Sequence, residues 1–283
     1  MADIGKRNKL RVVRETAPGI YLDGGIHQDI LLPKRYVVAG TAVGAELDVF
    51  VYRDSEDRLV ATTEVPLVMV GECAFLKVIN IRSGVGAFLD WGLSKDLLLP
   101  IREQMRPVTT GERVVAYVYL DPLTGRIVAT MRLQNHLDLA RPPFAEGQAV
   151  RLMISGETPL GYRAVVENTH TGLLYHTDLN ITLAPGQQLS GYIRTIRPDG
   201  KIDLCLNPTG HQRIVPLAQQ IMQALAANEG RLDFDDKSSP EAIRAKFSTS
   251  KKAFKQAVGS LFRERLICFE NGGIRLLPPP AGR

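Results

Sequence analysis

The chain has 283 residues, of which 45% are hydrophobic and 23% charged, and it carries a formal net charge of +5. This composition is typical of a soluble protein that is long enough for two or more domains. No apolar run approaches the roughly 18 residues that a membrane span needs, and the N-terminus lacks the hydrophobic core of a secretion signal. We therefore expect a cytoplasmic protein with no membrane partner.

An internal repeat organises most of the chain. The segment Gly19–Pro33 returns, rewritten, as Gly86–Pro100, and both of its ends are displaced by 67 residues. A third and more diverged copy begins at Gly161 and keeps the same order of pieces up to Leu206. A fixed period is the sequence signature of duplicated structural units. The sequence thus predicts three similar modules in tandem.

Each repeat is expected to form five short strands separated by turn-forming residues. In the second copy the predicted strands are 74–81, 87–90, 97–99, 113–120 and 126–132. This spacing leaves no room for a crossover helix and is typical of a small all-β barrel. We expect a mainly β protein with three five-stranded barrels, at residues 1–68, 69–138 and 145–210.

In the fourth strand of the repeats, aliphatic side chains alternate with aromatic ones. Val49 and Val51 share one face in the first copy and should fill the barrel, because strand side chains alternate between two faces. The opposite face carries Phe50, then Tyr117 and Tyr192 in the later copies. Such rings stack on bases in barrels that bind single-stranded nucleic acid. We favour the alternative that these three rings pack against a neighbouring barrel, because tandem modules need interface residues.

After residue 210 the apolar period changes from that of a strand to that of a helix. The predicted elements, in order, are a helix ending at Gly230, a helix opened by Ser238–Glu241, a helix capped by Ser250 and a hairpin over 266–277. Three helices followed by a hairpin correspond to a winged-helix domain, with a C-terminal α+β fold, which we expect at residues 214–280.

The same tail is the most basic part of the chain. From residue 215 onward, 11 Lys and Arg residues stand against 7 Asp and Glu residues. Cations outside the apolar stripe of the third helix are Lys251, Lys252, Lys255 and Arg263. The last helix of a winged-helix domain commonly faces nucleic acid, and lysines are typical phosphate contacts. A solvated helix surface is the alternative, and the clustering favours binding.

The second copy contains a recognisable motif. Gly86-Ala-Phe-Leu-Asp-Trp-Gly92, followed by Lys95-Asp-Leu-Leu-Leu99, resembles the core of the ribosomal-protein S-one type of RNA-binding domain, which is an OB-fold. The resemblance implies that aromatic side chains on the second and third strands bind RNA. The RNA-binding candidates on the barrels are Tyr21, Phe88, Tyr175, His176 and Arg194.

The repeats also depart from the pattern of that family. Pro33 and Pro100 occupy positions where the family usually has His, so these strands lack one ring and one backbone donor. In the third copy, Arg163 stands where a Phe is expected. None of the three copies matches the pattern in full.

Three such barrels followed by a winged helix are similar to the conserved virulence factor B family of bacterial RNA-binding proteins. The resemblance extends over essentially the whole chain. It implies a non-catalytic, cytoplasmic protein that binds single-stranded RNA and regulates gene expression after transcription.

Motifs of catalysis and metal binding are missing from the sequence. There is no phosphate-binding loop, nucleophile elbow or zinc-protease motif, and Ser83–Gly86 leads into a strand, unlike a dinucleotide loop. Asp23 and Asp90 recur beside glycines and should cap loops. Cysteines expected to be buried thiols are Cys73, Cys205 and Cys268. We expect no enzyme, cofactor, metal or small-molecule substrate.

Two other functions are compatible with the same modules. A winged-helix regulator of transcription would bind duplex DNA, although the third helix offers mostly Lys and few side chains that read bases. An adaptor would instead use its aromatic faces to bind the ribosome or another protein.

Overall fold

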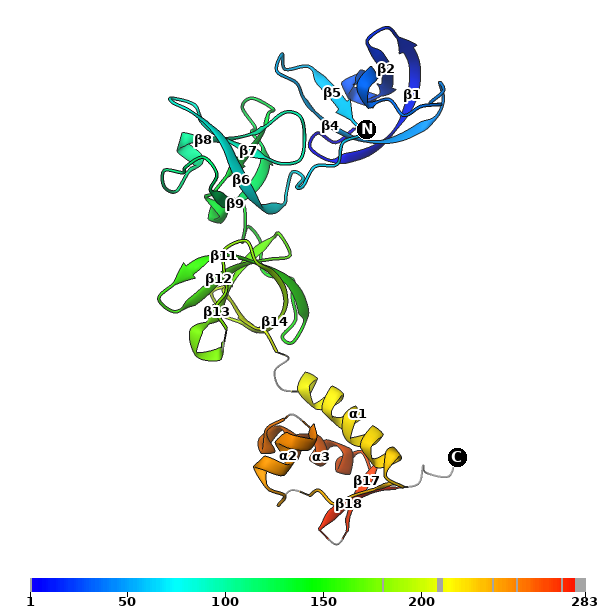
Figure 1. Cartoon of the computed structure of the whole chain (residues 1–283), viewed down its shortest axis with the longest axis vertical. Coiled ribbons are helices and arrows are strands. Elements are labelled where there is room, and N and C mark those ends of the chain that lie inside the picture. The colour runs from blue at the N-terminus through cyan, green and yellow to red at the C-terminus, as the bar shows by residue number, and fades with distance from the viewer. Residues whose placement is uncertain are drawn as a thin grey trace. The chain divides into compact units, whose positions relative to one another are not determined.

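A computed structural model describes residues 2–179, 181–207, 211–235, 237–247, 249–270 and 272–277 (Figure 1). The chain divides into two compact units. The first holds Met1–Pro143, Val150–Ser190 and Ile196–Leu204, and the second holds Phe144–Ala149, Gly191–Thr195 and Cys205–Arg283. The first two barrels thus lie in the first unit, the winged-helix domain lies in the second, and the division passes through the third barrel.

The repeats form three closed barrels of five strands each, which confirms the predicted fold class. The first barrel consists of β1 (Arg7–Thr16), β2 (Gly19–Asp23), β3 (Asp29–Pro33), β4 (Glu46–Arg53) and β5 (Leu59–Thr62). The second consists of β6 (Cys73–Arg82), β7 (Gly86–Asp90), β8 (Leu97–Pro100), β9 (Arg113–Leu120) and β10 (Ile127–Thr130). The third consists of β11 (Ala149–Thr158), β12 (Gly161–Val166), β13 (His170–Tyr175), β14 (Gln188–Ile196) and β15 (Ile202–Cys205).

Strand order is the same in all three barrels, with the first, second, third, fifth and fourth strands as successive neighbours. The first, second and third strands pair antiparallel, and the third and fifth pair parallel. Short 3-10 helices join the strands at Gly25–His27, Lys34–Tyr36, Ile101–Glu103, Leu133–Asn135 and His176–Asp178. The domain boundaries at residues 68, 138 and 210 remain predictions.

The glycine that begins the second strand of each barrel has a steric role. A Cβ atom added to Gly19, Gly86 or Gly161 would collide with the carbonyl oxygen of the neighbouring third strand. In register, these glycines lie opposite Pro33, Pro100 and Tyr175. The repeated Gly is therefore required by close backbone approach, and Tyr175 takes the place of the two prolines.

The side chains of the fourth strand alternate between the inside and the outside of the barrel, as the sequence predicts. Val49 and Val51 are fully buried inside the first barrel. Phe50 lies on the opposite face, is also fully buried, and packs with its ring edge-to-face on Trp91 of the second barrel at 5.6 Å between centroids. The packing interpretation of Phe50 is thus confirmed. Tyr117 is half-buried and stacks on His136, whereas Tyr192 is half-buried on β14.

Polar groups reinforce the contact between the first two barrels. The ammonium group of Lys95 donates to the carbonyl oxygens of Arg53 and Asp54, at 2.7 and 2.9 Å. Burial lowers the pKa of Lys95. Arg126 pairs with Asp57 at 2.6 Å. Lys95 lies in the loop between the second and third strands of the second barrel, whereas Asp57 and Arg126 lie in loops between fourth and fifth strands. The polar contacts between the first two barrels are therefore made mainly by loops.

The winged-helix domain contains α1 (His211–Ala227), β16 (Arg231–Leu232), α2 (Pro240–Phe247), α3 (Lys251–Arg263), β17 (Ile267–Glu270) and β18 (Gly273–Leu276). The expected cap is present at α3, because the Ser250 hydroxyl accepts a hydrogen bond from the Ala253 amide. Phe254 and Leu261 lie in a single apolar core. The sequence predicted the helices and the hairpin but not β16, which adds a third strand beside β18. Asn271 of the predicted turn lies outside the described residues.

No helix within the described ranges is long and apolar enough to cross a membrane.

Cysteine burial differs in part from the sequence-based expectation. Cys73 and Cys205 are buried, but Cys268 is only half-buried, because it lies on a strand of the small three-stranded sheet. Burial raises the pKa of the Cys73 thiol to about 12. Since only thiolates react readily, an alkylating reagent at mildly alkaline pH should label Cys268 first. Peptide mass spectrometry checks this order, and faster labelling of Cys73 than of Cys268 would contradict it.

Candidate nucleic-acid interface

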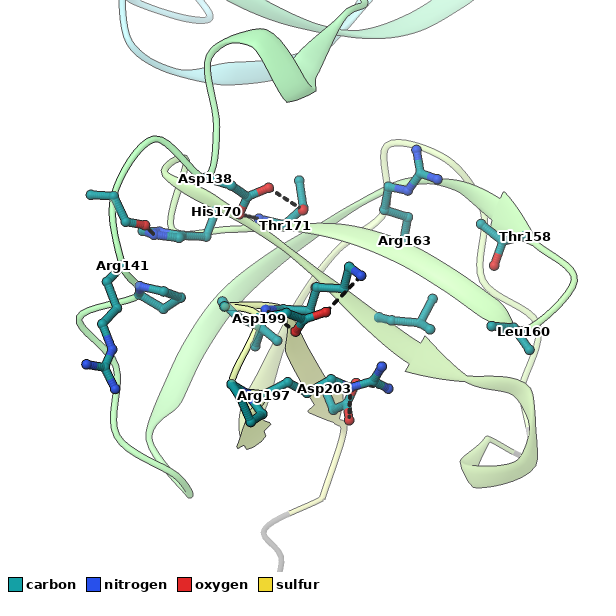
Figure 2. Close-up of a pocket in the computed structure, with 18 of the residues that line it drawn as sticks. Asp138, Arg141, Thr158, Leu160, Arg163, His170, Thr171, Arg197, Asp199 and Asp203 are labelled. Carbon is teal, nitrogen blue, oxygen red and sulfur yellow. Dashed lines mark hydrogen bonds and ion pairs between the residues drawn. The ribbon is translucent and has the colours of Figure 1, made fainter.

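A groove of about 1260 Å³ lies on the third barrel (Figure 2). Its floor comes from β12, β13 and β15, one end comes from the turn Thr158–Leu160, and one side comes from the loop Arg197–Lys201. The other side is the segment 138–142, which precedes the barrel. In OB-folds, the face of the second and third strands together with these two loops binds oligonucleotides. The groove therefore lies where an OB-fold offers its oligonucleotide-binding face.

Four cations line this groove, and two of them have no counterion among the residues that the structure describes. Within the described residues, neither Arg141 nor Arg163 has a side-chain hydrogen bond or ion pair, and both are exposed. Figure 2 shows them on opposite sides of the groove. Arg197 pairs with Asp203 at 2.9 Å, and Lys201 pairs with Asp199 at 2.8 Å. The two unpaired guanidinium groups are free to bind phosphates in the manner typical of Arg.

Tyr175 lies beside the groove and helps to hold its charged floor. Its hydroxyl donates to the Asp203 carboxylate at 3.1 Å, and the Arg197 guanidinium donates to the same hydroxyl. The Asp203 carboxylate raises the pKa of Arg197, because it accepts a hydrogen bond from the guanidinium. The half-buried Tyr175 ring shares the outward face of β13 with Leu173, which lines the groove.

The other third-barrel candidates lie at different places. His176 follows Tyr175 but turns toward the end of β11, where its Nε2 atom lies 3.2 Å from the Thr158 carbonyl oxygen and 3.5 Å from the Glu157 carboxylate. Arg194 is exposed on β14. None of these three candidates lines the groove itself. Tyr175 bonds the lining residues Asp203 and Arg197, and His176 contacts the lining residue Thr158, whereas Arg194 lies apart on β14.

The second-strand rings of the first two barrels, Tyr21 and Phe88, are half-buried and accompanied by arginines. The Arg14 guanidinium lies 3.7 Å from the centre of the Tyr21 ring, and that of Arg82 lies 5.6 Å from the centre of the Phe88 ring. Arg14 is in turn paired with Asp29 at 3.1 Å. A base that stacked on the Tyr21 ring would have to displace this guanidinium or stack on it.

Basic residues of the winged-helix domain gather on α3. Lys252, Lys255 and Arg263 are exposed, and Lys251 is half-buried with its ammonium group donating to the Lys237 carbonyl oxygen at 3.2 Å. The Arg263 side chain donates to the Gly259 carbonyl oxygen on its own helix. The four side chains thus form a basic helix surface, as the sequence predicts.

Sequence reasoning missed the groove cations Arg141, Arg197 and Lys201, and it treated Arg163 only as a departure from the family pattern. A signal was present in the loop between the fourth and fifth strands. This loop reads Asp54-Ser-Glu-Asp-Arg58 in the first copy but Arg197-Pro-Asp-Gly-Lys201 in the third. The change from acidic to mixed and basic composition marks the barrel whose loop lines the groove.

The described residues contain no cluster of three or more His, Cys, Asp or Glu side chains that could hold a metal ion. The repeated aspartates Asp23 and Asp90 cap loops, as expected from the sequence. Asp23 accepts from the Gly25 amide and Asp90 accepts from the Gly92 amide, at 2.9 and 3.0 Å.

Comparisons with known proteins agree with this architecture. Residues 4–64 match the model of the S1 domain, and residues 219–276 match the model of the CvfB-like winged helix domain. Both are domain types that bind nucleic acid, and the chain combines S1-type barrels with a winged helix.

Relatives match nearly the whole length of the chain. Conserved virulence factor B of Staphylococcus saprophyticus is 28% identical over 256 residues, covering 85% of this chain and 83% of that protein. The uncharacterized protein YitL of Bacillus subtilis is 26% identical over 281 residues, covering 95% and 92%. The similarity to conserved virulence factor B that the sequence predicts is thereby confirmed.

A solved structure of a multidomain protein with nucleic acid binding domains from Streptococcus pneumoniae also matches. It is 22% identical, covers 97% of this chain and 98% of that one, and has a TM-score of 0.40.

Proposed function

We propose that this chain is a non-catalytic protein that binds single-stranded RNA, with its main site in the groove of the third barrel. The observation that carries the proposal is the groove itself, with Arg141 and Arg163 on its two sides, neither of them paired with any described residue. Single strands bind OB-folds through a positively charged groove and through stacking on exposed side chains. Tyr175, beside the floor, is the ring placed to assist stacking. Tyr21 and Phe88 are secondary stacking sites.

Regulation of gene expression after transcription, in the cytoplasm, is the role we propose for this binding. Support comes from the combination of three barrels suited to single strands with one basic winged helix, and from relatives named conserved virulence factor B. The experiment is a binding titration of the full chain with oligouridine and with a DNA duplex of equal length. Tighter binding of oligouridine supports the proposal, whereas tighter binding of the duplex favours the transcriptional regulator.

The winged-helix domain should add affinity that does not depend on sequence. In the triple variant Lys251→Ala, Lys252→Ala and Lys255→Ala, oligouridine should bind more weakly. For every phosphate of the single strand that the variant no longer neutralises, the slope of log affinity against log salt should become shallower by about 0.7. Filter binding or fluorescence anisotropy at several salt concentrations measures both quantities.

A matched control removes the same charge from the first two barrels, through Lys9→Ala, Arg11→Ala and Lys77→Ala, which change exposed side chains outside the groove. If the α3 triple variant keeps the parent affinity and salt slope, α3 is a solvated surface and does not contact RNA.

A further inference from the structure

One side of the groove is not part of the third barrel. The segment 138–142 links the second barrel to the third and contributes Asp138, Ala140, Arg141 and Pro142 to the groove lining. We call this segment the linker wall. Figure 2 shows it running down the side of the groove opposite Arg163. The groove is therefore incomplete without residues that precede the barrel.

Asp138 attaches the beginning of the linker wall to β13. Its amide donates to the Thr169 carbonyl oxygen at 3.0 Å. Its carboxylate accepts from the Thr171 amide at 2.8 Å and from the Thr171 hydroxyl at 2.6 Å. The backbone of Asp138 has a φ of +60°, which non-glycine residues adopt at a cost. Three hydrogen bonds that hold a strained residue indicate a position that the fold specifies.

His170 attaches the middle of the linker wall. The side chain is 4% exposed, and its Nε2 atom lies 2.9 Å from the Ala140 carbonyl oxygen. Because a carbonyl oxygen can only accept, Nε2 donates this bond. The other ring nitrogen bonds the Thr169 hydroxyl at 2.9 Å. A buried imidazole with both nitrogens bonded keeps the linker wall against the edge of β13.

The residue before the linker wall belongs to the contact between the second and third barrels. Leu137 is 1% exposed and packs in a cluster with Cys73 and Val115 of the second barrel and Met153 and Val165 of the third. The Cys73 amide donates to the Asn168 side-chain oxygen at 3.0 Å, across the same contact. Leu137, which is buried between the barrels, is therefore followed directly by Asp138, which attaches the linker wall to β13.

We propose that RNA binding in the groove and docking of the third barrel on the second are one coupled event, with Asp138 and His170 as positioning residues. This inference rests on the proposed function. RNA binds most tightly when the linker wall is in place, and the linker wall is in place when Leu137 is buried between the barrels. By thermodynamic linkage, bound RNA must then stabilise the docked arrangement to the same degree.

Cys73 provides the readout, because its thiol is buried at this contact, and we expect it to become reactive when the barrels separate. The full chain is treated with an alkylating reagent, with and without oligouridine, and Cys73 labelling is followed by peptide mass spectrometry. A ligand at 100 times its Kd should slow labelling through the open state by up to about 100-fold.

Two variants separate positioning from contact. Asp138→Ala should weaken oligouridine binding by about tenfold, since removing a charged hydrogen bond has an effect of this order, and should abolish the protection of Cys73. Arg141→Ala should weaken binding but keep the protection, because it removes a phosphate contact and leaves the linker wall attached. Thr171→Val, which removes one partner of Asp138 and keeps the amide, should give an intermediate result.

The outcomes are distinguishable. If the unmodified chain binds no oligouridine, the proposed function is overturned, and this inference with it. If it binds oligouridine but Cys73 is labelled at the same rate, or if Asp138→Ala binds as the parent does while remaining folded by circular dichroism, the inference alone is overturned.

Discussion

The variant Arg163→Glu should bind oligouridine about 10- to 100-fold more weakly than the parent chain, since a charge-assisted hydrogen bond contributes about 1.5 to 3 kcal/mol. Arg163 is exposed on β12, has no counterion within the described residues, and faces the groove. The new carboxylate would repel phosphate and would add to the acidic side chains Asp199 and Asp203 of the same lining. Fluorescence anisotropy with labelled oligouridine measures the change.

Arg11→Glu is the matched control for this variant. It makes the same charge reversal at an exposed strand position of the first barrel, outside the groove. The general attraction of RNA to a basic protein falls equally in both variants. A greater loss of oligouridine affinity in Arg163→Glu would therefore show that the groove itself binds RNA. Equal losses would mean that net charge, and not the groove, determines binding.

Phe50→Ala should destabilise the pair formed by the first two barrels by about 3 to 5 kcal/mol, the usual cost of removing a fully buried phenylalanine. The ring is fully buried and contacts Trp91 edge-to-face. Trp91 is the single tryptophan of the chain, so its fluorescence reports on this contact during urea unfolding. The midpoint of the fluorescence transition should fall to a lower urea concentration.

Leu123→Ala is the matched control, because Leu123 is 85% exposed on the second barrel. Its fluorescence midpoint should stay close to that of the parent, since exposed substitutions usually have small effects. A Phe50→Ala midpoint equal to that of Leu123→Ala would show that the two barrels do not depend on this contact.

The fold could be predicted from the sequence to a large extent, because its two strongest signals are local. The exact 67-residue offset between Gly19 and Gly86 indicated duplicated units, and the strand alternation indicated barrels. The helix cap at Ser250 also has a local cause. The strand Arg231–Leu232 was not predicted, because two residues cannot show a period and its pairing partner lies far along the chain.

It was harder to predict whether an outward-facing ring is exposed to water or packs against a neighbouring barrel. Phe50 occupies a face that, in one barrel alone, would be exposed to solvent. Alternation can place a ring outside its own barrel, but it cannot tell water from a neighbouring module. The need of tandem modules for interface residues favours packing, and burial of the Phe50 ring confirms this prediction.

The groove was the least predictable feature. It is assembled from the linker wall, β12, β13 and the loop Arg197–Lys201, which are distant in sequence. Tyr175 was found because it matches a family motif, whereas Arg141 belongs to no repeat and has no counterpart to compare. Cations that act together only after folding leave no spacing pattern that a single sequence can display.

Photocrosslinking of 4-thiouridine-labelled oligouridine to the full chain, followed by mapping of the crosslinked peptides, shows directly whether RNA lies in the groove. We expect the strongest crosslinks on the groove lining, in peptides that contain Leu160, Arg163, Leu173 or Lys201. Crosslinks confined to the first two barrels or to the winged-helix domain would contradict this expectation.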